Sequence, residues 1–429
     1  MIVKDVVCPF CGCLCDDIEV DVEENRVVAV ANACELGTKK LMGEKRMKNP
    51  ILRDGKTWKD ITYDEAIRYT VDMLLDAERP LLYGWSGTHG EAQCVGVHMA
   101  ELVRGVIDNT SSVCHGPSIL AIQEVGHPGC TLGVVKNRAD LVIYWGANPI
   151  AAHPRHLSRY TRYADGFFLE NAFRDRKVIV MDIRKTETAN IADEFVQIKP
   201  GGDYAVLSAL RAIVRGKEDV VPRTVAGVTR EQLVRVVDLC KAAKFGAVYF
   251  GLGLTMTRGK YKNVRNAIEL VTELNRHTKF TISAMRGHYN VYGSNEVNTW
   301  MTGYPFGIDF SRGIAFYNPG ETTAVDILAR KECDAALIVG SDPAAHFPRP
   351  CLKHLADIPV VQLDPYPNAT TAFCNVQIPV AVTGIDAEGT AYRMDGVPIR
   401  TRKVLSTDYP SDEDVLSRIY RKMQEARAI

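Results

Sequence analysis

The 429-residue sequence lacks several features that would assign it to a functional class at once. Its 52 basic and 52 acidic side chains cancel, so no overall field attracts nucleic acid or an anionic membrane. No stretch approaches the ~20 apolar residues that a membrane-spanning helix needs. The opening residues, Met1–Asp5, carry an acid where a secretory signal would begin its apolar run. We therefore expect a cytoplasmic protein that acts on small molecules.

Two catalytic motifs are also missing. The sequence has no Gly-x-x-x-x-Gly-Lys-Ser/Thr phosphate loop, which leaves ATP hydrolysis without support, and no pair of histidines has the spacing of a binuclear hydrolase. The composition itself is that of a globular protein, with 46% hydrophobic and 24% charged residues. The length is typical of about three domains.

The twelve cysteines are the first positive signal. A reducing compartment disfavours disulfides and makes metal binding the better explanation for cysteines that gather together. Cys8, Cys11, Cys15 and Cys34 are separated by two, three and eighteen residues. A triplet with one distant partner predicts a 4Fe-4S cubane, whereas zinc, the rival, usually takes its thiolates as two short pairs. Cys13 lies between two of these ligands, and we expect it not to bind the cluster.

Cys114 differs from the remaining cysteines. It lies in a loop of small residues, 111–117, with His115 beside it and Pro117 behind it, and a helix is predicted to begin near Ser118. From the residues alone, Cys114 is a nucleophile, a metal ligand or a buried thiol. The other six are expected to be apolar filler of the core: Cys94, Cys130, Cys240, Cys333, Cys351 and Cys374.

Beyond the cysteine loop, short β-branched runs alternate with amphipathic stretches, which predicts a doubly wound α/β fold with parallel strands. Strands are predicted at 81–83, 141–145, 178–181, 247–250, 336–339 and 360–363. Helices are predicted at 91–106, 203–216, 230–243, 261–275 and 411–428.

An internal repeat relates two pairs of these strands. The segment 145–155 is echoed by 339–349, and each copy follows its strand with Gly-x-Asn-Pro or Gly-x-Asp-Pro. The next strands end at Asp182 and Asp364, which offer a carboxylate to a ribose or a base. Taken alone, either copy is more simply a tight turn with capping residues. Two copies predict two nucleotide-like ligands, or one ligand with two such ends.

Taken in order, these features resemble the molybdopterin oxidoreductases of the dimethyl sulfoxide reductase and formate dehydrogenase type. The match runs along almost the whole chain, through the cysteine loop, residues 57–66, the turn at 146–149, the stretch 182–203 and the motif at 286–293. The resemblance implies two molybdopterin guanine dinucleotides that hold tungsten or molybdenum, with a terminal sulfido group on the metal. The implied chemistry interconverts carbon dioxide and formate.

The resemblance also assigns roles to single residues. It implies that Cys114 binds the metal, that His115 handles a proton and that Arg286 binds a carboxylate. The alternatives are that His115 only hydrogen-bonds its loop and that Arg286 only pairs with a pterin phosphate. The residues implied to surround the two dinucleotides are Gly146, Asn148, His153, Asp182, Arg184, Thr186, Asp203, Gly340, Asp342, His346 and Asp364.

The implied architecture has three parts: a 4Fe-4S domain at 1–52, an α/β pterin-binding domain built from 53–110 and 290–429, and a second one at 111–289. The family's carboxy-terminal barrel is expected on a separate polypeptide, because this sequence ends at Ile429 soon after a predicted helix. Other implied partners are an amidohydrolase-like subunit that receives formate and polyferredoxin- or ferredoxin-like electron donors.

Two departures from formate dehydrogenases are visible. Their lysine two residues after the fourth cluster cysteine is Leu36 here, and Lys39 and Lys40 follow a little later. The second repeated turn has Asp342 where the first has Asn148. Two rival hypotheses stay open: another enzyme of the family, such as a formate dehydrogenase, and a non-catalytic subunit that keeps the cubane for electron transfer and has no pterins.

Overall fold

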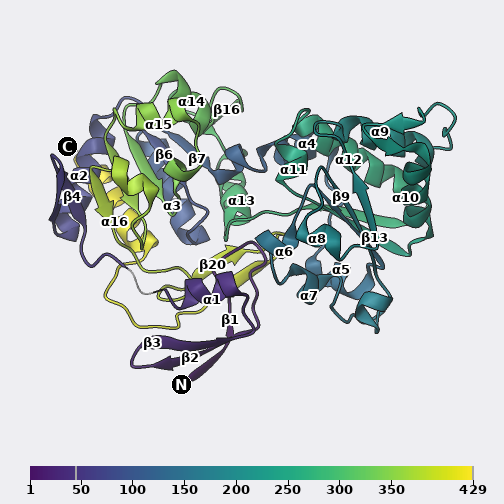
Figure 1. The fold of residues 1–429 in the computed structure, drawn as a ribbon. Coiled ribbons are helices and arrows are strands. Elements are labelled where there is room, and N and C mark those ends of the chain that lie inside the picture. The colour runs from purple at the N-terminus through teal and green to yellow at the C-terminus, as the bar shows by residue number, and fades with distance from the viewer. Residues whose placement is uncertain (44–45, 428–429) are drawn as a thin grey trace. The chain divides into compact units, whose positions relative to one another are not determined.

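The computed structural model describes residues 1–43 and 46–427 and divides into two compact units (Figure 1). Unit 1 comprises Met1–Val113, His288–Arg393 and Pro398–Ile429, and unit 2 comprises Cys114–Gly287 and Met394–Val397. The segment 1–52, for which we expect a domain of its own, falls within unit 1 in this division. Within the part of the chain that the structure describes, no helix combines the length and apolar character needed to cross a membrane.

Unit 2 is built on a five-stranded sheet in which all neighbours are parallel. The strand order is β10 (Glu194–Gln197), β9 (Lys177–Asp182), β8 (Leu141–Trp145), β13 (Phe245–Phe250) and β14 (Lys279–Ala284). Its longer helices are α4 (Gly116–Val125), α9 (Asp203–Val214), α10 (Arg230–Ala242) and α12 (Tyr261–Leu274). The strands and crossover helices predicted for this region are confirmed.

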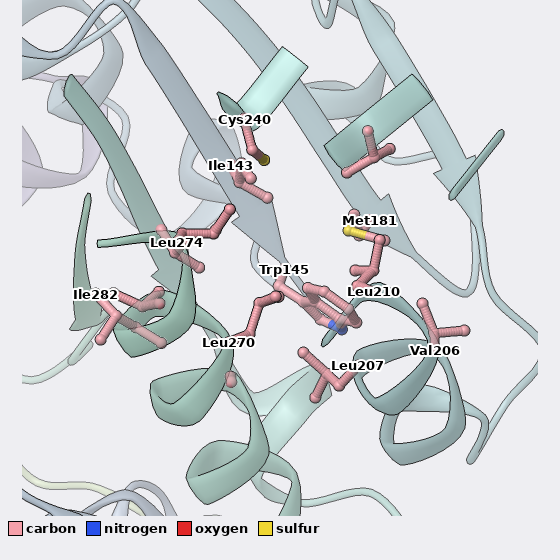
Figure 2. Packing of buried hydrophobic residues seen from close by; sticks show 14 of the residues in the cluster. Ile143, Trp145, Met181, Val206, Leu207, Leu210, Cys240, Leu270, Leu274 and Ile282 are labelled. Atoms are coloured by element: carbon pink, nitrogen blue, oxygen red, sulfur yellow. The ribbon is translucent and has the colours of Figure 1, made fainter. Parts of the chain in front are cut away.

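The core of unit 2 lies between the sheet and the helices α9, α10 and α12 (Figure 2). Trp145 of β8 points between Leu207 of α9 and Leu270 of α12, and Met181 of β9 lies beside them. Because alternate residues of a strand point to opposite faces, Tyr144 is buried on the other side of the sheet. Burying each large apolar side chain contributes about 1.5–3 kcal/mol.

Unit 1 contains a nine-stranded sheet whose five central strands are parallel. These are β7 (Val106–Asn109), β6 (Leu81–Gly84), β17 (Ala336–Val339), β18 (Val360–Leu363) and β19 (Val376–Ile378). Antiparallel strands extend both edges: β15 (Ile308–Asp309) and β16 (Phe316–Tyr317) beside β7, and β4 (Ile51–Asp54) and β5 (Thr57–Asp60) beside β19. The strands predicted here are confirmed.

Helices cover both faces of this second sheet. On one face α2 (Tyr63–Asp76), α3 (Gly90–Leu102) and α16 (Asp412–Arg427) share a core with the strands, and on the other face α14 (Ala324–Arg330) and α15 (Arg349–Leu355) do so. The helix α13 (Val291–Thr302) packs against α3. Unit 1 is therefore a mixed α/β unit of the predicted kind.

One predicted helix is too long. The stretch 91–106 is helical only to Leu102, and its last residue already begins β7. Arg104 has a φ of +53°, and a Cβ at Gly105 would lie 2.5 Å from the Pro80 carbonyl oxygen. The chain therefore turns out of the helix here, and an apolar run that spans a helix end and a buried strand cannot be divided by periodicity alone.

The amino-terminal segment of unit 1 forms a three-stranded antiparallel sheet, β1 (Ile2–Val6), β2 (Ile18–Glu23) and β3 (Arg26–Ala31), followed by α1 (Glu35–Leu41). Shorter elements complete the two units: η1 (Thr110–Val113), α5 (Leu132–Arg138), α6 (Pro149–Ala152), α7 (His156–Tyr160), η2 (Ala172–Arg174), α8 (Glu187–Asn190), β11 (Thr224–Val225), β12 (Val228–Thr229), α11 (Leu252–Thr255), η3 (Pro343–Ala345), η4 (Ala369–Phe373), β20 (Gly389–Tyr392) and β21 (Pro398–Thr401).

The repeat in the sequence is a repeat of a whole sheet. The order β10-β9-β8-β13-β14 in unit 2 corresponds to β19-β18-β17-β6-β7 in unit 1, because the repeated turn follows β8 in one unit and β17 in the other. The order along the chain differs, since β13 and β14 follow β8 whereas β6 and β7 precede β17. Each repeated turn therefore lies at the point where the strand order reverses, which is where open α/β sheets bind ligands.

Candidate metal and cofactor site

The cysteine loop connects β1 and β2 in unit 1. The backbone N–H of Cys8 donates to the carbonyl of Cys15 at 2.8 Å, and the N–H of Leu14 donates to the carbonyl of Cys11 at 3.1 Å. These two bonds close the loop at its base and fold its middle into a turn. The first three predicted ligands are therefore held near one another by the backbone.

Cys34 reaches the same place through helix α1. It is the N-cap residue of α1, and its sulfur accepts a hydrogen bond from the Gly37 N–H at 3.4 Å. A Cβ at Gly37 would lie 2.9 Å from the Cys8 sulfur and 3.6 Å from the Cys34 sulfur. The first and the last predicted ligands thus converge on one glycine, where a side chain would displace them.

Electrostatic interactions among the four thiols show that they are neighbours. Burial raises the pKa of the Cys8 thiol above its ordinary range, and the other three predicted ligands raise it further. The pKa of Cys11 is lowered, first by a hydrogen bond from the Cys13 thiol. Because such close thiols ionise together only against a cation, this donor set fits a thiophilic metal or cluster. As they stand, no three His, Cys, Asp or Glu side chains in residues 1–43 and 46–427 form a group that could hold a metal ion, and the cubane stays a prediction.

Cys114 is the first residue of unit 2 and lies two residues before α4. Its carbonyl accepts a hydrogen bond from the Thr255 hydroxyl at 3.1 Å. Burial raises the pKa of its thiol to about 11, against the opposing effect of the Arg286 guanidinium. Such a thiol is protonated at neutral pH, which disfavours the nucleophile hypothesis. Cys114 better fits a ligand, because a bound soft metal ionises the thiol that coordinates it.

His115 is bonded at both ring nitrogens. Nε2–H donates to the Met285 carbonyl at 3.1 Å, and Nδ1 accepts from the Ser118 hydroxyl at 3.0 Å. Burial, assisted by the Arg286 guanidinium, lowers the pKa of the imidazole to about 3. The neutral ring therefore joins the Cys114 loop to the end of β14. These bonds agree with the alternative hypothesis that His115 only hydrogen-bonds its loop. Proton transfer by His115 stays a prediction.

Arg286 follows β14 and is buried. Its guanidinium is close enough to lower the pKa values of both Cys114 and His115, so unit 2 brings the three predicted catalytic residues together. His153 donates from Nε2–H to the Arg286 carbonyl at 2.9 Å. One nitrogen of its ring thus holds the backbone at Arg286, and the dinucleotide contact expected of His153 stays a prediction.

The two repeated turns require glycine. Gly146 and Gly340 have φ values of +54° and +55°, which L side chains rarely adopt. A Cβ at Gly146 would lie 2.7 Å from the carbonyl carbon of Gly253, and a Cβ at Gly340 would lie 3.1 Å from the Cα of Gly87. Each turn therefore crosses closely over the turn that follows the neighbouring strand, β13 or β6.

Asn148 and Asp342, two residues after these glycines, accept the same kind of hydrogen bond in both copies. Asn148 Oδ1 accepts from the Thr188 hydroxyl at 2.7 Å, and Asp342 Oδ1 accepts from the Thr370 hydroxyl at 2.6 Å. In the sequence, Thr188-Ala189 resembles Thr371-Ala372, but the threonine that makes this bond in the second copy, Thr370, lies one residue earlier. Asn148 and Asp342 thus hold the next loop in place, although neither side chain caps the short helix that follows it.

The two strand-end carboxylates also bind backbone. Asp182 Oδ1 accepts from the N–H of Ile183 at 2.7 Å, and Asp364 Oδ1 accepts from the N–H of Tyr366 at 2.9 Å. Burial raises the pKa of Asp364 to about 6, and the nearby Lys40 opposes this rise. One oxygen of each carboxylate is therefore used to shape its own turn.

The carboxylate of Asp203, the first residue of α9, has one oxygen bonded within the protein and one that suits a ligand. Its Oδ1 accepts from Nε1–H of Trp145 at 2.9 Å. Its Oδ2 is buried and accepts no hydrogen bond from the described residues, and burial raises the pKa of the group. Such an oxygen fits a ligand that brings N–H donors, as the edge of a guanine does. Of the other predicted dinucleotide contacts, Thr186 caps α8, while Arg184 and His346 are exposed.

The two lysines of α1 behave differently. Lys39 forms an exposed ion pair with Glu35 at 2.6 Å. Lys40 lies over the ring of Tyr366, with its Nζ 5.2 Å from the centroid, and its pKa is lowered by burial against the opposing effect of Asp364. Lys40 is therefore the lysine that joins the cysteine loop to the carboxyl end of β18.

Three comparisons decide the family. The molybdopterin oxidoreductase family model matches residues 46–415. The chain belongs to the molybdopterin oxidoreductase family. Within it, the chain is 52% identical over 433 residues to the B subunit of the tungsten-containing formylmethanofuran dehydrogenase 2 of Methanocaldococcus jannaschii, covering 99% of both chains. It is 26% identical to formate dehydrogenase H of Escherichia coli, covering 70% of this chain and 48% of that protein.

A solved structure shares the fold of this chain. The chain resembles a chain of the formyltransferase/hydrolase complex FhcABCD from Methylorubrum extorquens, solved with methylofuran, with a TM-score of 0.71 and 20% identity. The match covers 89% of this chain and all of that one. At this identity the likeness shows the fold alone.

Several residues of the site escaped sequence reasoning. Ser118 could have been found, because a hydroxyl three residues after His115 at a helix start is a local pattern. Thr255 and Trp145 carry no such signal, because their partners lie 141 and 58 residues away along the chain. Only the fold brings these pairs together.

Proposed function

We propose that this chain is the catalytic polypeptide of a formylmethanofuran dehydrogenase and reduces carbon dioxide to formate in methanogenesis. The observation that carries the proposal is the 52% identity that extends over 99% of the chain. The grouping of Cys114, His115 and Arg286 supports it, because it combines a soft metal ligand with a cation for a carboxylate.

We propose further that the chain binds tungsten or molybdenum through Cys114, with a terminal sulfido group and two molybdopterin guanine dinucleotides. When bound, this centre supplies the two-electron chemistry that carbon dioxide reduction needs. The Oδ2 of Asp203, which has no hydrogen-bond partner among the described residues, suits the guanine of one dinucleotide. The close crossing at Gly146 and its counterpart at Gly340 suit a bare backbone that approaches a ligand.

The protein's own residues would then position the substrate and control its surroundings. The buried guanidinium of Arg286 offers paired N–H donors to the oxygens of carbon dioxide and formate. His115 and His153 fix the backbone on both sides of this arginine through the carbonyls of Met285 and Arg286. Forming formate consumes one proton with two electrons, and His115 is the proposed group for that proton once its bonds to the loop rearrange.

Electrons would enter through a 4Fe-4S cluster bound by Cys8, Cys11, Cys15 and Cys34, delivered by ferredoxin-like partners. Lys40 supports this route, because Asp364 at the sheet edge and the Cys8 thiol are both close enough to raise its pKa against the effect of burial. The relatives are named as subunits, so we also propose a multi-subunit complex in which one partner is amidohydrolase-like and another supplies the family's barrel domain.

The rival hypotheses have weaker support. The relative that is a formate dehydrogenase shares only 26% identity with this chain, and the match covers 48% of that relative. A non-catalytic electron-transfer subunit has no specific observation in its favour, since the solved relative in a formyltransferase/hydrolase complex shows the fold alone. Fold alone therefore does not carry redox chemistry, and the metal content decides between the hypotheses.

The first test is elemental analysis of the anaerobically purified native complex, counted per copy of this chain. We expect about one tungsten or molybdenum and at least about four irons, the content of one cubane. Cys114→Ala should lose the heavy metal and keep the iron. The matched control Cys130→Ala, which removes another half-buried thiol of unit 2, should keep both. Iron without a heavy metal would leave only the electron-transfer role, and zinc in place of iron would overturn the cluster.

A further inference from the structure

An aromatic patch on the surface of unit 2 has no role in the proposed function. It belongs to the segment 161–176, which joins α7 to β9 (Figure 1). The patch consists of four side chains whose exposed fractions run from 48% to 78%: Tyr163, Phe167, Phe168 and Phe173. The rings of Phe167 and Phe168 meet edge to face, with their centroids 4.8 Å apart. Single exposed apolar residues need no explanation, whereas a group of aromatic ones marks an interaction site.

The patch lies at the end of the sheet opposite the proposed dinucleotide site. The segment 161–176 ends where β9 begins, and Arg176 Nε–H donates to the carbonyl of Ala139, two residues before β8, at 3.0 Å. Gly146 and Asp182 lie at the carboxyl ends of the same two strands. Because neighbouring parallel strands share one amino edge, a ligand bound at the carboxyl edge does not account for the patch.

The backbone beneath the two central rings is fixed by hydrogen bonds. The N–H of Phe167 donates to Asn137 Oδ1 at 2.9 Å, and the N–H of Phe168 donates to the Asn137 carbonyl at 3.2 Å. Gly166 and Leu169 exchange N–H bonds at 2.9 and 3.1 Å. The rings are therefore presented by an ordered turn, and a partner that binds them has little backbone entropy to remove.

Two arginines give the patch its charge. The guanidinium carbon of Arg138 lies 4.3 Å from the ring centroid of Phe168, and that of Arg174 lies 6.0 Å from the centroid of Phe173. Both arginines are exposed, and neither forms an ion pair with an acid in the part of the chain that the structure describes. A guanidinium stacked on a ring keeps its N–H groups for a carboxylate. Aromatic rings with arginines are the composition of interface hot spots.

The chemistry of the patch favours a different protein as its occupant. Asp165 and Glu170 are exposed on the same segment, and an anionic membrane would repel them. A two-fold contact with a second copy would set this exposed patch against itself, which supplies no pocket for the rings. We propose that the aromatic patch docks another subunit of the complex, whose surface offers an apolar pocket to Phe167 and Phe168. Carboxylates on that surface pair with the two arginines. This inference rests on the proposed multi-subunit complex.

The test measures how the purified native complex dissociates on dilution, by mass photometry. Phe167→Ala removes a ring of the patch, and Arg138→Glu reverses one of its charges. The matched controls on unit 2 are Val220→Ala, which shortens a side chain that is 65% exposed, and Lys217→Glu, which reverses an exposed cation. All four variants should keep the thermal unfolding of the wild type, because each changed side chain lies on the surface.

We expect Phe167→Ala to raise the dissociation constant of one subunit by at least about 30-fold, the loss that marks a hot spot. Arg138→Glu should raise it as well, and the two controls should leave it unchanged. A complex that stays equally tight in Phe167→Ala would overturn the surface alone. A wild-type chain that purifies without partners would instead refute the proposed complex.

Photochemical cross-linking in the same purified complex identifies the occupant, with Phe167 replaced by p-benzoylphenylalanine. A covalent bond to another subunit, in a segment that contains aspartate or glutamate, supports the proposal. A bond to a segment without acids or to a second copy of this chain would overturn it. Vesicles of phosphatidylcholine and phosphatidylglycerol that bind the wild type and not Phe167→Ala would also overturn it, in favour of a membrane surface.

Discussion

The two sheet edges share their backbone geometry and differ in their charges. In unit 2, Asp203 has a buried carboxylate oxygen that accepts no hydrogen bond from the described residues. In unit 1, Asp364 lies near Lys40, and Asp386, which follows β19 as Asp203 follows β10, forms an ion pair with Arg46. Both cations come from the amino-terminal segment, which belongs to unit 1.

The two copies of the sheet are thus more alike in backbone geometry than in their charged groups. The φ values of Gly146 and Gly340 agree to within 1°, and both turns make the same threonine bond. These features follow from the path of the backbone, which tolerates little change at a close crossing. The charged side chains at the two edges are not copied in the same way, since Asp342 stands where the first copy has Asn148. We therefore expect the two dinucleotides to be held by different polar groups in similar backbone cradles.

The largest expected effect of a substitution is at the ion pair of unit 1. Asp386→Asn leaves Arg46, whose side chain is 15% exposed, without its carboxylate. Removing one partner of a buried ion pair costs about 3–5 kcal/mol, and the partial exposure of Arg46 favours the lower end of that range. Urea unfolding of the purified chain measures the loss.

The control for this prediction is Asp219→Asn, which changes an exposed carboxylate of unit 2. Exposed substitutions away from special contacts stay within about 0.5 kcal/mol. If Asp386→Asn costs no more than this control, the pair behaves as a surface ion pair and the contrast between the two edges loses its main support.

The next effect compares the two glycines. An alanine in the left-handed conformation costs about 1–2 kcal/mol. At Gly146 the new Cβ also meets backbone at 2.7 Å, which adds about 1–3 kcal/mol of overpacking, whereas at Gly340 the contact is 3.1 Å. Gly146→Ala should therefore lower the free energy of unfolding more than Gly340→Ala. Equal losses in urea unfolding would mean that the crossing in unit 2 relaxes as readily as the one in unit 1.

The threonine bonds should reveal the charge difference directly. Thr370→Val removes a hydrogen bond to the carboxylate of Asp342, and Thr188→Val removes one to the neutral amide of Asn148. Bonds to charged groups contribute about 1.5–3 kcal/mol and neutral ones about 0.5–1.5 kcal/mol. The loss of stability should therefore be larger in unit 1. A larger loss for Thr188→Val would contradict the expected difference in charge between the two turns.

The sequence predicted the sheets well because their signals are local. A buried parallel strand is a short β-branched run, and each of the six predicted runs is a strand. The repeated turn could be recognised in the sequence because the positive φ at Gly146 and Gly340 strongly favours glycine at both positions. The end of the helix at Leu102 was missed, because the apolar run continues into β7 without a change of composition.

The chemistry of the site was less predictable. Cys114 and Arg286 are 172 positions apart in the sequence, and only a family resemblance joined them before the fold did. The bonds of His115 and His153 to backbone carbonyls have no sequence signature, since any residue can supply a carbonyl. The pairing of Lys40 with Asp364 likewise depends on how α1 packs near β18.

The last expected effect is the pH dependence that Asp364 confers on unit 1. Its pKa is about 6 in the folded chain and near the ordinary 3.8 when unfolded. The folded state therefore binds this proton first, and stability should rise as the pH falls from about 6 toward 4 and decline as the pH rises again. Asp364→Asn should remove this contribution from the stability curve measured by urea unfolding.

Lys40 gives the sharper version of this test. Its ammonium opposes the rise in the pKa of Asp364, so Lys40→Met should move the pH-dependent window to higher pH. Lys39→Met is the matched control on the same helix, because Lys39 pairs with Glu35 on the surface, and it should leave the window where it is. Equal shifts in the two variants would mean that Asp364 responds to the net charge of α1 and not to one neighbouring ammonium. The contrast between a neutralised edge in unit 1 and an open carboxylate in unit 2 would then rest on Arg46 alone.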